Sequence, residues 1–150
     1  MKKVIATIGF SILAAAAAAN AQETTWSGTI RGIVEKQCLA CHGPESAPEY
    51  PLFKKEKEKW LSKGQAMRMD TYSHLVSFVG WPNTGAMMRR LDDGKASKEG
   101  KPGNMYSHLG ATEVERQKNL ALFKEWVGNW SLKRLPETTK EELNGIKVRY

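Results

Sequence analysis

The chain has 150 residues, a net charge of +7 and two cysteines. This length is enough for one domain with a modest hydrophobic core. The basic charge is compatible with nucleic acid, an anionic membrane or an acidic protein as partner, but the sequence contains no nucleic-acid-binding motif. No apolar stretch after residue 21 is long enough to span a bilayer.

The first 21 residues have the organisation of a secretory signal peptide. Lys2 and Lys3 form a positive start, residues 4–19 are apolar and rich in alanine, and Ala19-Asn20-Ala21 is a small-x-small cleavage site. We therefore expect cleavage after Ala21, export to the periplasm and no stable membrane anchor afterwards. The mature chain keeps 21 basic and 16 acidic side chains, a net charge of +5.

Residues 26–37 are predicted to form the first helix. The apolar residues at helical spacing on one face are Trp26, Ile30, Ile33 and Val34, and charged residues lie elsewhere. This helix leads directly into the pentapeptide Cys38-Leu39-Ala40-Cys41-His42.

Two cysteines three positions apart, followed at once by a histidine, form the pattern of c-type haem attachment. Both thiols project to one side of a helical turn, where each can add to one vinyl group of the porphyrin. The pattern predicts one covalent haem c held by Cys38 and Cys41, with His42 as the proximal iron ligand. Export is consistent with this prediction, since haem is attached to c-type cytochromes outside the cytoplasmic membrane.

Three other readings of the cysteine pair are weaker. A thioredoxin-like disulfide site would follow a strand-then-helix pattern, which is missing here. A zinc site needs about four ligands, and only His74 and His108 remain to supply them. A structural disulfide closing so short a loop would stabilise the fold little.

Residues 43–63 are the least periodic part of the chain, because three prolines exclude one continuous helix. The end of this stretch is rich in lysine. We interpret it either as a solvated helical face with internal salt bridges or as a basic docking rim beside the haem edge. Its charged residues are Lys54, Lys55, Glu56, Lys57, Glu58, Lys59 and Lys63.

The middle of the chain alternates short helical patterns with loops. Residues 70–79 are predicted to form a second helix capped by Asp70, with His74 off its apolar stripe and therefore a surface histidine. Residues 84–93 favour another short helix that stops at a glycine. Residues 95–104 are polar and contain Gly and Pro, so we expect a loop.

Residues 112–130 give the clearest helical pattern. Thr112-Glu113-Val114-Glu115 has the form of a capping box. The expected apolar face consists of Leu120, Phe123, Trp126, Val127 and Trp130. Residues 131–150 form a polar tail with a possible short helix over 138–144. We therefore expect a signal peptide (1–21), one domain (22–130) and a C-terminal extension (131–150).

A low-spin haem that carries electrons needs a second axial ligand opposite His42, and methionine suits a high-potential carrier. Met105 is the preferred candidate, because it follows a Gly/Pro-rich loop and precedes the last helix by seven residues. Met87 and Met88 compete but belong to a predicted helix, and Met67 and Met69 are further candidates. His108 or an open sixth site also remain alternatives.

Together these features resemble a class I c-type cytochrome. The resemblance covers residues 26–130 and rests on the amphipathic first helix, the attachment pentapeptide, the methionine loop around Met105 and the aromatic last helix. It implies an all-α cytochrome c-like fold, in which the N- and C-terminal helices cross around one covalent haem. It also implies that a backbone carbonyl, from Pro48 or Pro51, orients the ring of His42.

The function implied is that of an electron carrier and not an enzyme. Single electrons would pass between redox protein donors and acceptors as the iron cycles between Fe(III) and Fe(II). The positive charge favours partners with acidic docking surfaces and the predicted location disfavours nucleic acid. The alternatives are a haem enzyme or gas-binding cytochrome with an open sixth site, and a fixed electron-relay subunit of a larger redox complex.

Overall fold

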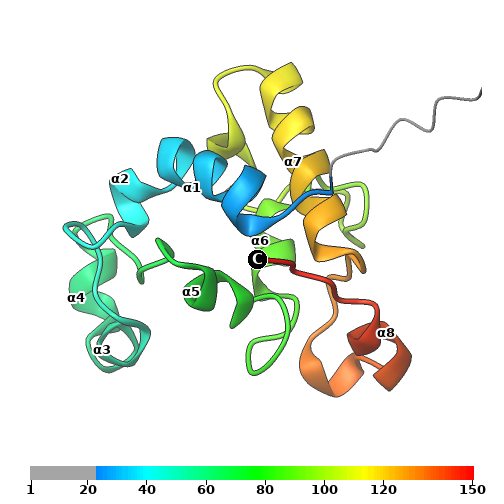
Figure 1. The fold of residues 1–150 in the computed structure, drawn as a ribbon. Helices are drawn as coiled ribbons and strands as arrows, with labels where there is room; N and C mark the ends of the chain where they lie inside the picture. The colour runs from blue at the N-terminus through cyan, green and yellow to red at the C-terminus, as the bar shows by residue number, and fades with distance from the viewer. Residues whose placement is uncertain (1–22) are drawn as a thin grey trace, which may run out of the picture.

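Short helices joined by loops make up the structure, a computed structural model that describes residues 23–150 (Figure 1). The predicted signal peptide lies outside the described residues. Within residues 23–150 there is no β-strand, only an isolated bridge between Gly128 and Ile146, and no helix is long and apolar enough to cross a membrane. The elements in chain order are η1 (Trp26–Ile30), α1 (Arg31–Gln37), α2 (Leu39–His42), α3 (Tyr50–Lys55), α4 (Lys57–Leu61), α5 (Tyr72–Val76), α6 (Ala86–Leu91), η2 (Tyr106–Leu109), α7 (Glu113–Val127), η3 (Leu135–Glu137) and α8 (Lys140–Asn144).

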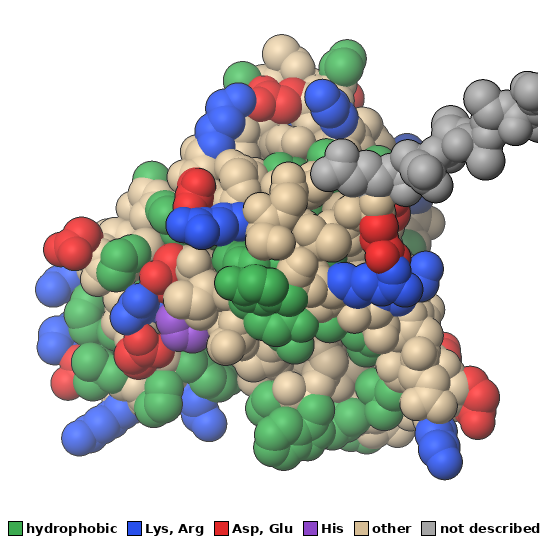
Figure 2. All heavy atoms as spheres, in the orientation of Figure 1, with side chains coloured by type: hydrophobic (Ala, Val, Ile, Leu, Met, Phe, Trp, Pro, Cys, Tyr) green, Lys and Arg blue, Asp and Glu red, His purple; other side chains and the backbone are tan. Residues whose placement is uncertain are grey.

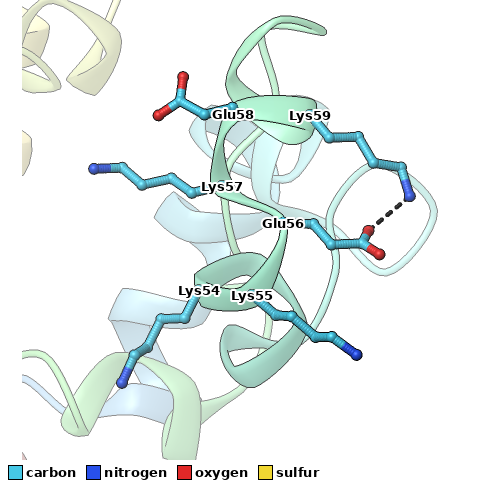
Figure 3. A pocket seen from close by; sticks show the side chains of 6 residues that line it. All are labelled: Lys54, Lys55, Glu56, Lys57, Glu58 and Lys59. Carbon is cyan, nitrogen blue, oxygen red and sulfur yellow. Dashed lines mark hydrogen bonds and ion pairs between the residues drawn. The ribbon is translucent and has the colours of Figure 1, made fainter.

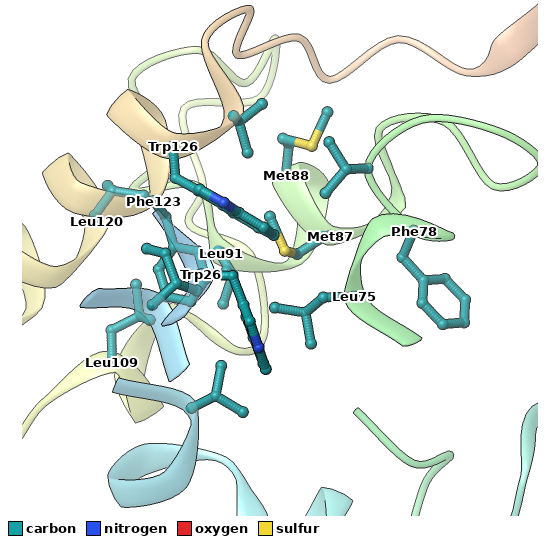
Figure 4. Packing of buried hydrophobic residues seen from close by; sticks show 14 of the residues in the cluster. Trp26, Leu75, Phe78, Met87, Met88, Leu91, Leu109, Leu120, Phe123 and Trp126 are labelled. Atoms are coloured by element: carbon teal, nitrogen blue, oxygen red, sulfur yellow. The ribbon is translucent and has the colours of Figure 1, made fainter. Parts of the chain in front are cut away.

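The core lies where the last long helix, α7, packs across the N-terminal helix formed by η1 and α1 (Figure 1). The indoles of Trp26 and Trp126 meet with their ring centroids 6.3 Å apart, and Figure 4 shows both surrounded by aliphatic and aromatic side chains. Burial of this apolar surface stabilises the crossing by about 25 cal/mol per Å². The all-α prediction is confirmed, and the two predicted apolar faces are buried except at Ile33 and Trp130, which are only partly buried. The buried apolar residues that these two helices contribute are Trp26, Ile30, Val34, Leu120, Phe123, Trp126 and Val127.

Of two predicted helix starts, one differs from the structure and one agrees with it. The second predicted helix is shorter, because α5 begins at Tyr72 and its cap is Thr71, whose hydroxyl accepts from the backbone N–H of His74 at 3.2 Å. The prediction that Asp70 caps this helix is therefore wrong; the Asp70 carboxylate pairs with Arg68 instead. The last helix starts as predicted after Thr112, which accepts from the N–H of Glu115 at 3.2 Å.

The second half of the expected capping box is displaced by one residue. The carboxylate of Glu115 accepts from the N–H of Ala111 at 2.9 Å and not from that of Thr112. Gly110 makes room for this arrangement, because a Cβ atom there would lie 2.6 Å from the Glu115 side chain. The helix ends at Gly128, where φ is +79°, so Trp130 lies beyond it.

The C-terminal tail returns to the crossing of the first and last helices. Its backbone provides hydrogen-bond partners for polar groups of the core. The carbonyl of Arg149 accepts from the N–H of Trp26 at 2.8 Å and from the indole N–H of Trp126 at 2.7 Å. The N–H of Val148 donates to the Trp126 carbonyl at 2.9 Å. Residues 145–150 therefore satisfy donors and acceptors that burial would otherwise leave without partners.

One side-chain hydrogen bond to this tail should contribute measurably to the stability of the fold. The hydroxyl of Tyr72 donates to the Val148 carbonyl at 2.7 Å, and Tyr72→Phe should lower the free energy of unfolding by about 1 kcal/mol. Denaturant unfolding followed by circular dichroism measures this change. The matched control is Tyr150→Phe, because Tyr150 is 69% exposed and should change stability by less than about 0.5 kcal/mol. Equal effects of the two substitutions would contradict the role given to the Tyr72 bond.

Candidate haem attachment site

The attachment pentapeptide forms the turn α2 at the end of the N-terminal helix. The carbonyl of Cys38 accepts from the N–H groups of Cys41 at 3.2 Å and His42 at 2.9 Å, which fixes the two cysteines one helical turn apart. Both are free thiols; Cys38 is partly buried against the core and Cys41 is exposed. This turn presents two thiols and one imidazole from a single rigid segment.

The electrostatics of Cys38 disfavour a thiol–disulfide redox site. Burial, with a smaller contribution from Cys41, raises the pKa of the Cys38 thiol to about 11, whereas a thiol–disulfide nucleophile needs a lowered pKa. No group of three or more His, Cys, Asp or Glu side chains is arranged to hold a metal ion among residues 23–150. The zinc reading therefore gains no support from the described part of the chain.

The ring of His42 is oriented by a backbone carbonyl. Its Nδ1 lies 2.7 Å from the carbonyl oxygen of Met67, and because a carbonyl can only accept, Nδ1 carries the proton and the lone pair of Nε2 is free for a metal. The carbonyl of His42 in turn accepts from the N–H of Met69 at 2.9 Å. The orienting carbonyl expected from Pro48 or Pro51 is thus that of Met67; the Pro48 carbonyl accepts from the N–H of Arg68 at 2.9 Å.

A charged network fixes the segment that orients His42. The guanidinium of Arg68 binds both carboxylate oxygens of Asp70, at 2.9 and 2.8 Å, and one oxygen of Glu49 at 2.7 Å. His74 lies between the same two carboxylates, with its ring nitrogens 3.1 Å from Asp70 and from Glu49. The bond from Arg68 lowers the pKa of Asp70 against the opposing effect of burial. Both ring nitrogens of His74 are occupied, so it is not a free ligand.

The loop that carries Met105 is anchored on one side to α6. The N–H of Gly103 donates to the Asp92 carbonyl at 2.8 Å, and the N–H of Met105 donates to the Arg90 carbonyl at 2.9 Å. Only glycine fits at position 103, because a Cβ atom there would lie 2.3 Å from the Arg90 carbonyl oxygen. The Gly/Pro-rich composition of this loop therefore allows a close backbone approach to α6.

The other side of the Met105 loop is anchored to α7. Asn119, buried on α7, donates to the Leu109 carbonyl at 2.6 Å. The hydroxyl of Tyr106 donates to Glu113 and accepts from Gln117 at 2.7 Å. Bonds from Tyr106, Gln117 and Arg116 lower the pKa of Glu113 to about 2, so its carboxylate remains ionised at neutral pH. Met105 is thus held between two helices.

The structure separates the five methionines considered as distal ligands. Met88 is 1% exposed and Met87 is 5% exposed, so neither side chain has a free surface toward a cofactor. Met67 and Met69 belong to the segment hydrogen-bonded to His42, which places them on the proximal side. Met105 is partly exposed, on the loop between α6 and α7. His108 lies on the same loop and is exposed.

A further observation concerns the fit of a haem. Among buried side-chain nitrogen and oxygen atoms of residues 23–150, the indole N–H of Trp60 lacks a hydrogen-bond partner. A buried donor without an acceptor is costly, and the propionate carboxylates of a haem are acceptors of suitable chemistry. The donor set of two free thiols and one imidazole with an available Nε2 fits a covalently attached haem.

Comparison with known proteins identifies the family. The family model "PccH Cytochrome c" matches residues 25–150. The chain belongs to the PccH cytochrome c family. The solved structure of the monohaem cytochrome PccH from Geobacter sulfurreducens is 63% identical, with a TM-score of 0.80, and the match covers 85% of this chain and 99% of that chain. No curated protein sequence matches the chain.

Membership of the PccH family settles the coarse chemistry. The chain is a monohaem c-type cytochrome with one covalently bound haem c, and its helical structure has the cytochrome c fold. The family supports a haem-based electron-carrying role. The family match extends through the tail to Tyr150, in agreement with the packing of residues 145–150 on the core.

Sequence reasoning missed two parts of this PccH-family site: the Met67 carbonyl and the Arg68 network. Backbone carbonyls carry no signal of their own in a sequence, so Met67 could not be identified by residue type. A local signal existed for the network, because Asp70 and His74 stand four residues apart, as do neighbours on one helix face.

The network predicts a pH dependence of stability. The folded-state pKa of Asp70 lies below its usual value of about 3.9, so its contribution to stability is complete above that pH. The contribution is lost as the pH falls through the lower folded-state pKa. Asp70→Asn should lower the free energy of unfolding at neutral pH by about 1 kcal/mol and flatten its decline below about pH 4.

Denaturant unfolding of both proteins at several pH values measures this effect. The control is Glu99→Gln, since Glu99 is exposed on a loop and forms no ion pair among the residues described. A parallel decline with pH in the wild type and Asp70→Asn would show that Asp70 does not contribute as inferred.

Proposed function

We propose that this protein is a periplasmic carrier of single electrons between redox proteins and does not catalyse a reaction on a bound substrate. When bound, the haem c supplies a one-electron Fe(III)/Fe(II) couple. Periplasmic location follows from the predicted signal peptide and agrees with the chemistry of haem attachment. The observation that carries the proposal is the orientation of His42 by the Met67 carbonyl at 2.7 Å.

Four side chains have separate roles in this proposal. Cys38 and Cys41 form the two thioethers, and His42 binds the iron through Nε2. The hydrogen bond from Nδ1 to Met67 raises the basicity of the imidazole and fixes its ring plane. Met105 supplies the distal thioether ligand. It is the methionine that is both partly exposed and held on a wall other than that of His42.

Two anchored walls suit electron transfer better than catalysis. A carrier benefits from ligands that do not move between oxidation states, because reorganisation slows electron transfer. Here the proximal segment is fixed by the Arg68 network, and the Met105 loop by α6 and α7. Trp26, Phe123 and Trp126 fill the core behind these walls and keep water out.

Attachment can be tested with cysteine variants. Replacing Cys38 and Cys41 together with Ala should abolish covalent haem, because no other cysteine is present in the sequence. Haem extracted with acidified acetone from the denatured protein measures the loss. Each single variant should retain one thioether and serves as the control. Haem that stays with the denatured double variant would contradict the assignment.

The distal ligand can be tested by spectroscopy. Met105→Ala should remove the weak sulfur-to-iron charge-transfer band of the ferric protein, because the thioether that gives rise to the band is gone. Met69→Leu and Met88→Leu are controls of similar volume and should keep the band. A band that survives in Met105→Ala would move the ligand to Met87 or Met88. Carbon monoxide binding to the reduced wild type would favour an open sixth site.

A further inference from the structure

The positive charge of the protein is concentrated on one hairpin of the chain. The segment 54–63, formed by the end of α3, all of α4 and the turn after it, carries five lysines and two glutamates, a net charge of +3. The mature chain as a whole carries +5. Ten residues therefore provide more than half of the net charge. We call this segment the lysine hairpin; its charged residues are Lys54, Lys55, Glu56, Lys57, Glu58, Lys59 and Lys63.

Most of this charge is not neutralised within the hairpin. Glu56 binds Lys59 at 2.6 Å, and this bond lowers the pKa of Glu56. Lys55 and Lys57 are exposed and form no ion pair with the described residues. Figure 3 shows their side chains extending from the backbone in different directions around an open surface hollow. The hairpin therefore presents available cations to an approaching partner.

The hairpin belongs to the loop that closes on the attachment site. Before the hairpin, the Pro48 carbonyl accepts from the N–H of Arg68 at 2.9 Å; after α4, the Trp60 carbonyl accepts from the N–H of Gln65 at 3.0 Å, which closes the turn that leads back toward Arg68. Arg68 adjoins Met67, which orients His42. In Figure 1, α2, α3 and α4 gather at one end of the molecule and α8 lies at the other.

Two residues in this part of the chain bear on the proposal. Cys41, on α2, is exposed, so a thioether formed there would lie at the protein surface. Trp60, within the hairpin, carries the buried N–H without a partner, and the ammonium groups of Lys59 and Lys63 each lie 5.3 Å from the centre of its ring. The cations of the hairpin are thus gathered over this indole.

We propose that electrons enter and leave at the lysine hairpin, through contact with a redox protein whose docking surface is acidic. This inference rests on the proposed carrier function. It adds which face of the protein contacts the redox partner. Opposite charges would speed encounter while leaving the complex small and weak. An anionic membrane is disfavoured as partner, because α3 and α4 have six and five residues and offer no long apolar face for insertion.

Charged small oxidants test this face without the natural partner. The reduced holoprotein is mixed in a stopped-flow instrument with hexacyanoferrate(III), an anion, or with tris(bipyridine)cobalt(III), a cation. At an ionic strength of about 0.1 M the Debye length is about 10 Å, so charges near the site of electron exit dominate. The double variant Lys55→Glu, Lys57→Glu should react at least about threefold more slowly with the anion and faster with the cation.

The control variant carries the same charge change at distant positions. Lys140 on α8 and Lys147 in the tail that follows it are exposed, and replacing both with Glu should leave each rate within about twofold of the wild type. Midpoint potentials of all three proteins are measured in parallel, so that a changed driving force is not mistaken for changed docking. Covalent haem content verifies that each variant folds.

Three results would overturn the inference in distinguishable ways. If both double variants change the rates alike, electrons do not leave at the hairpin, and the carrier function stands. If the wild type donates electrons to neither oxidant, the carrier function itself fails. Sedimentation of the wild type with phosphatidylglycerol vesicles at about 0.1 M ionic strength, lost on Lys55→Glu, Lys57→Glu, would assign the hairpin to lipid instead of protein.

Discussion

The hydrogen bond between Nδ1 of His42 and the Met67 carbonyl is the contact on which one half of the molecule depends. It connects a helical turn to a segment 25 residues later and fixes the tautomer of the ring. The loop between these two points, residues 43–66, contains α3 and α4. Their position follows from this closure and not from a core of their own, since Phe53 is the one buried residue on them. The Arg68 network then holds the closure in place.

The opposite wall depends on a different interaction, the packing of α7 across the N-terminal helix. Apolar burial there is extensive. The face drawn in Figure 2 is mixed, with charged side chains around an apolar patch near its centre. The Met105 loop is tied to this core by Asn119 and by the backbone of α6. The segment that holds His42 and the loop that carries Met105 therefore rest on separate supports. A substitution in the network should affect the environment of His42 before it affects that of Met105.

Local patterns explain which parts could be predicted from the sequence. The attachment pentapeptide lies within one helical turn, and the faces of the first and last helices repeat at helical spacing, so both could be predicted. Asp70 was misassigned because cap patterns are local, whereas its carboxylate is bound by the guanidinium of Arg68. The Met67 carbonyl and the tail carbonyls that accept from Trp26 and Trp126 are backbone groups, which residue type does not mark.

The contrast between a packed core and a loop held only at its ends explains why the basic charge lies on the hairpin. Charged side chains lose solvation when buried, so they gather on segments that the core does not need. The loop between His42 and Met67 is such a segment: its ends are fixed by hydrogen bonds, while Lys55 and Lys57 contribute no ion pair to the described fold. Because the lysines lie within the loop that closes on His42, surface charge can be carried by this loop without disturbing the support of His42. Docking at this loop would therefore bring a partner close to the haem while the core remains unchanged.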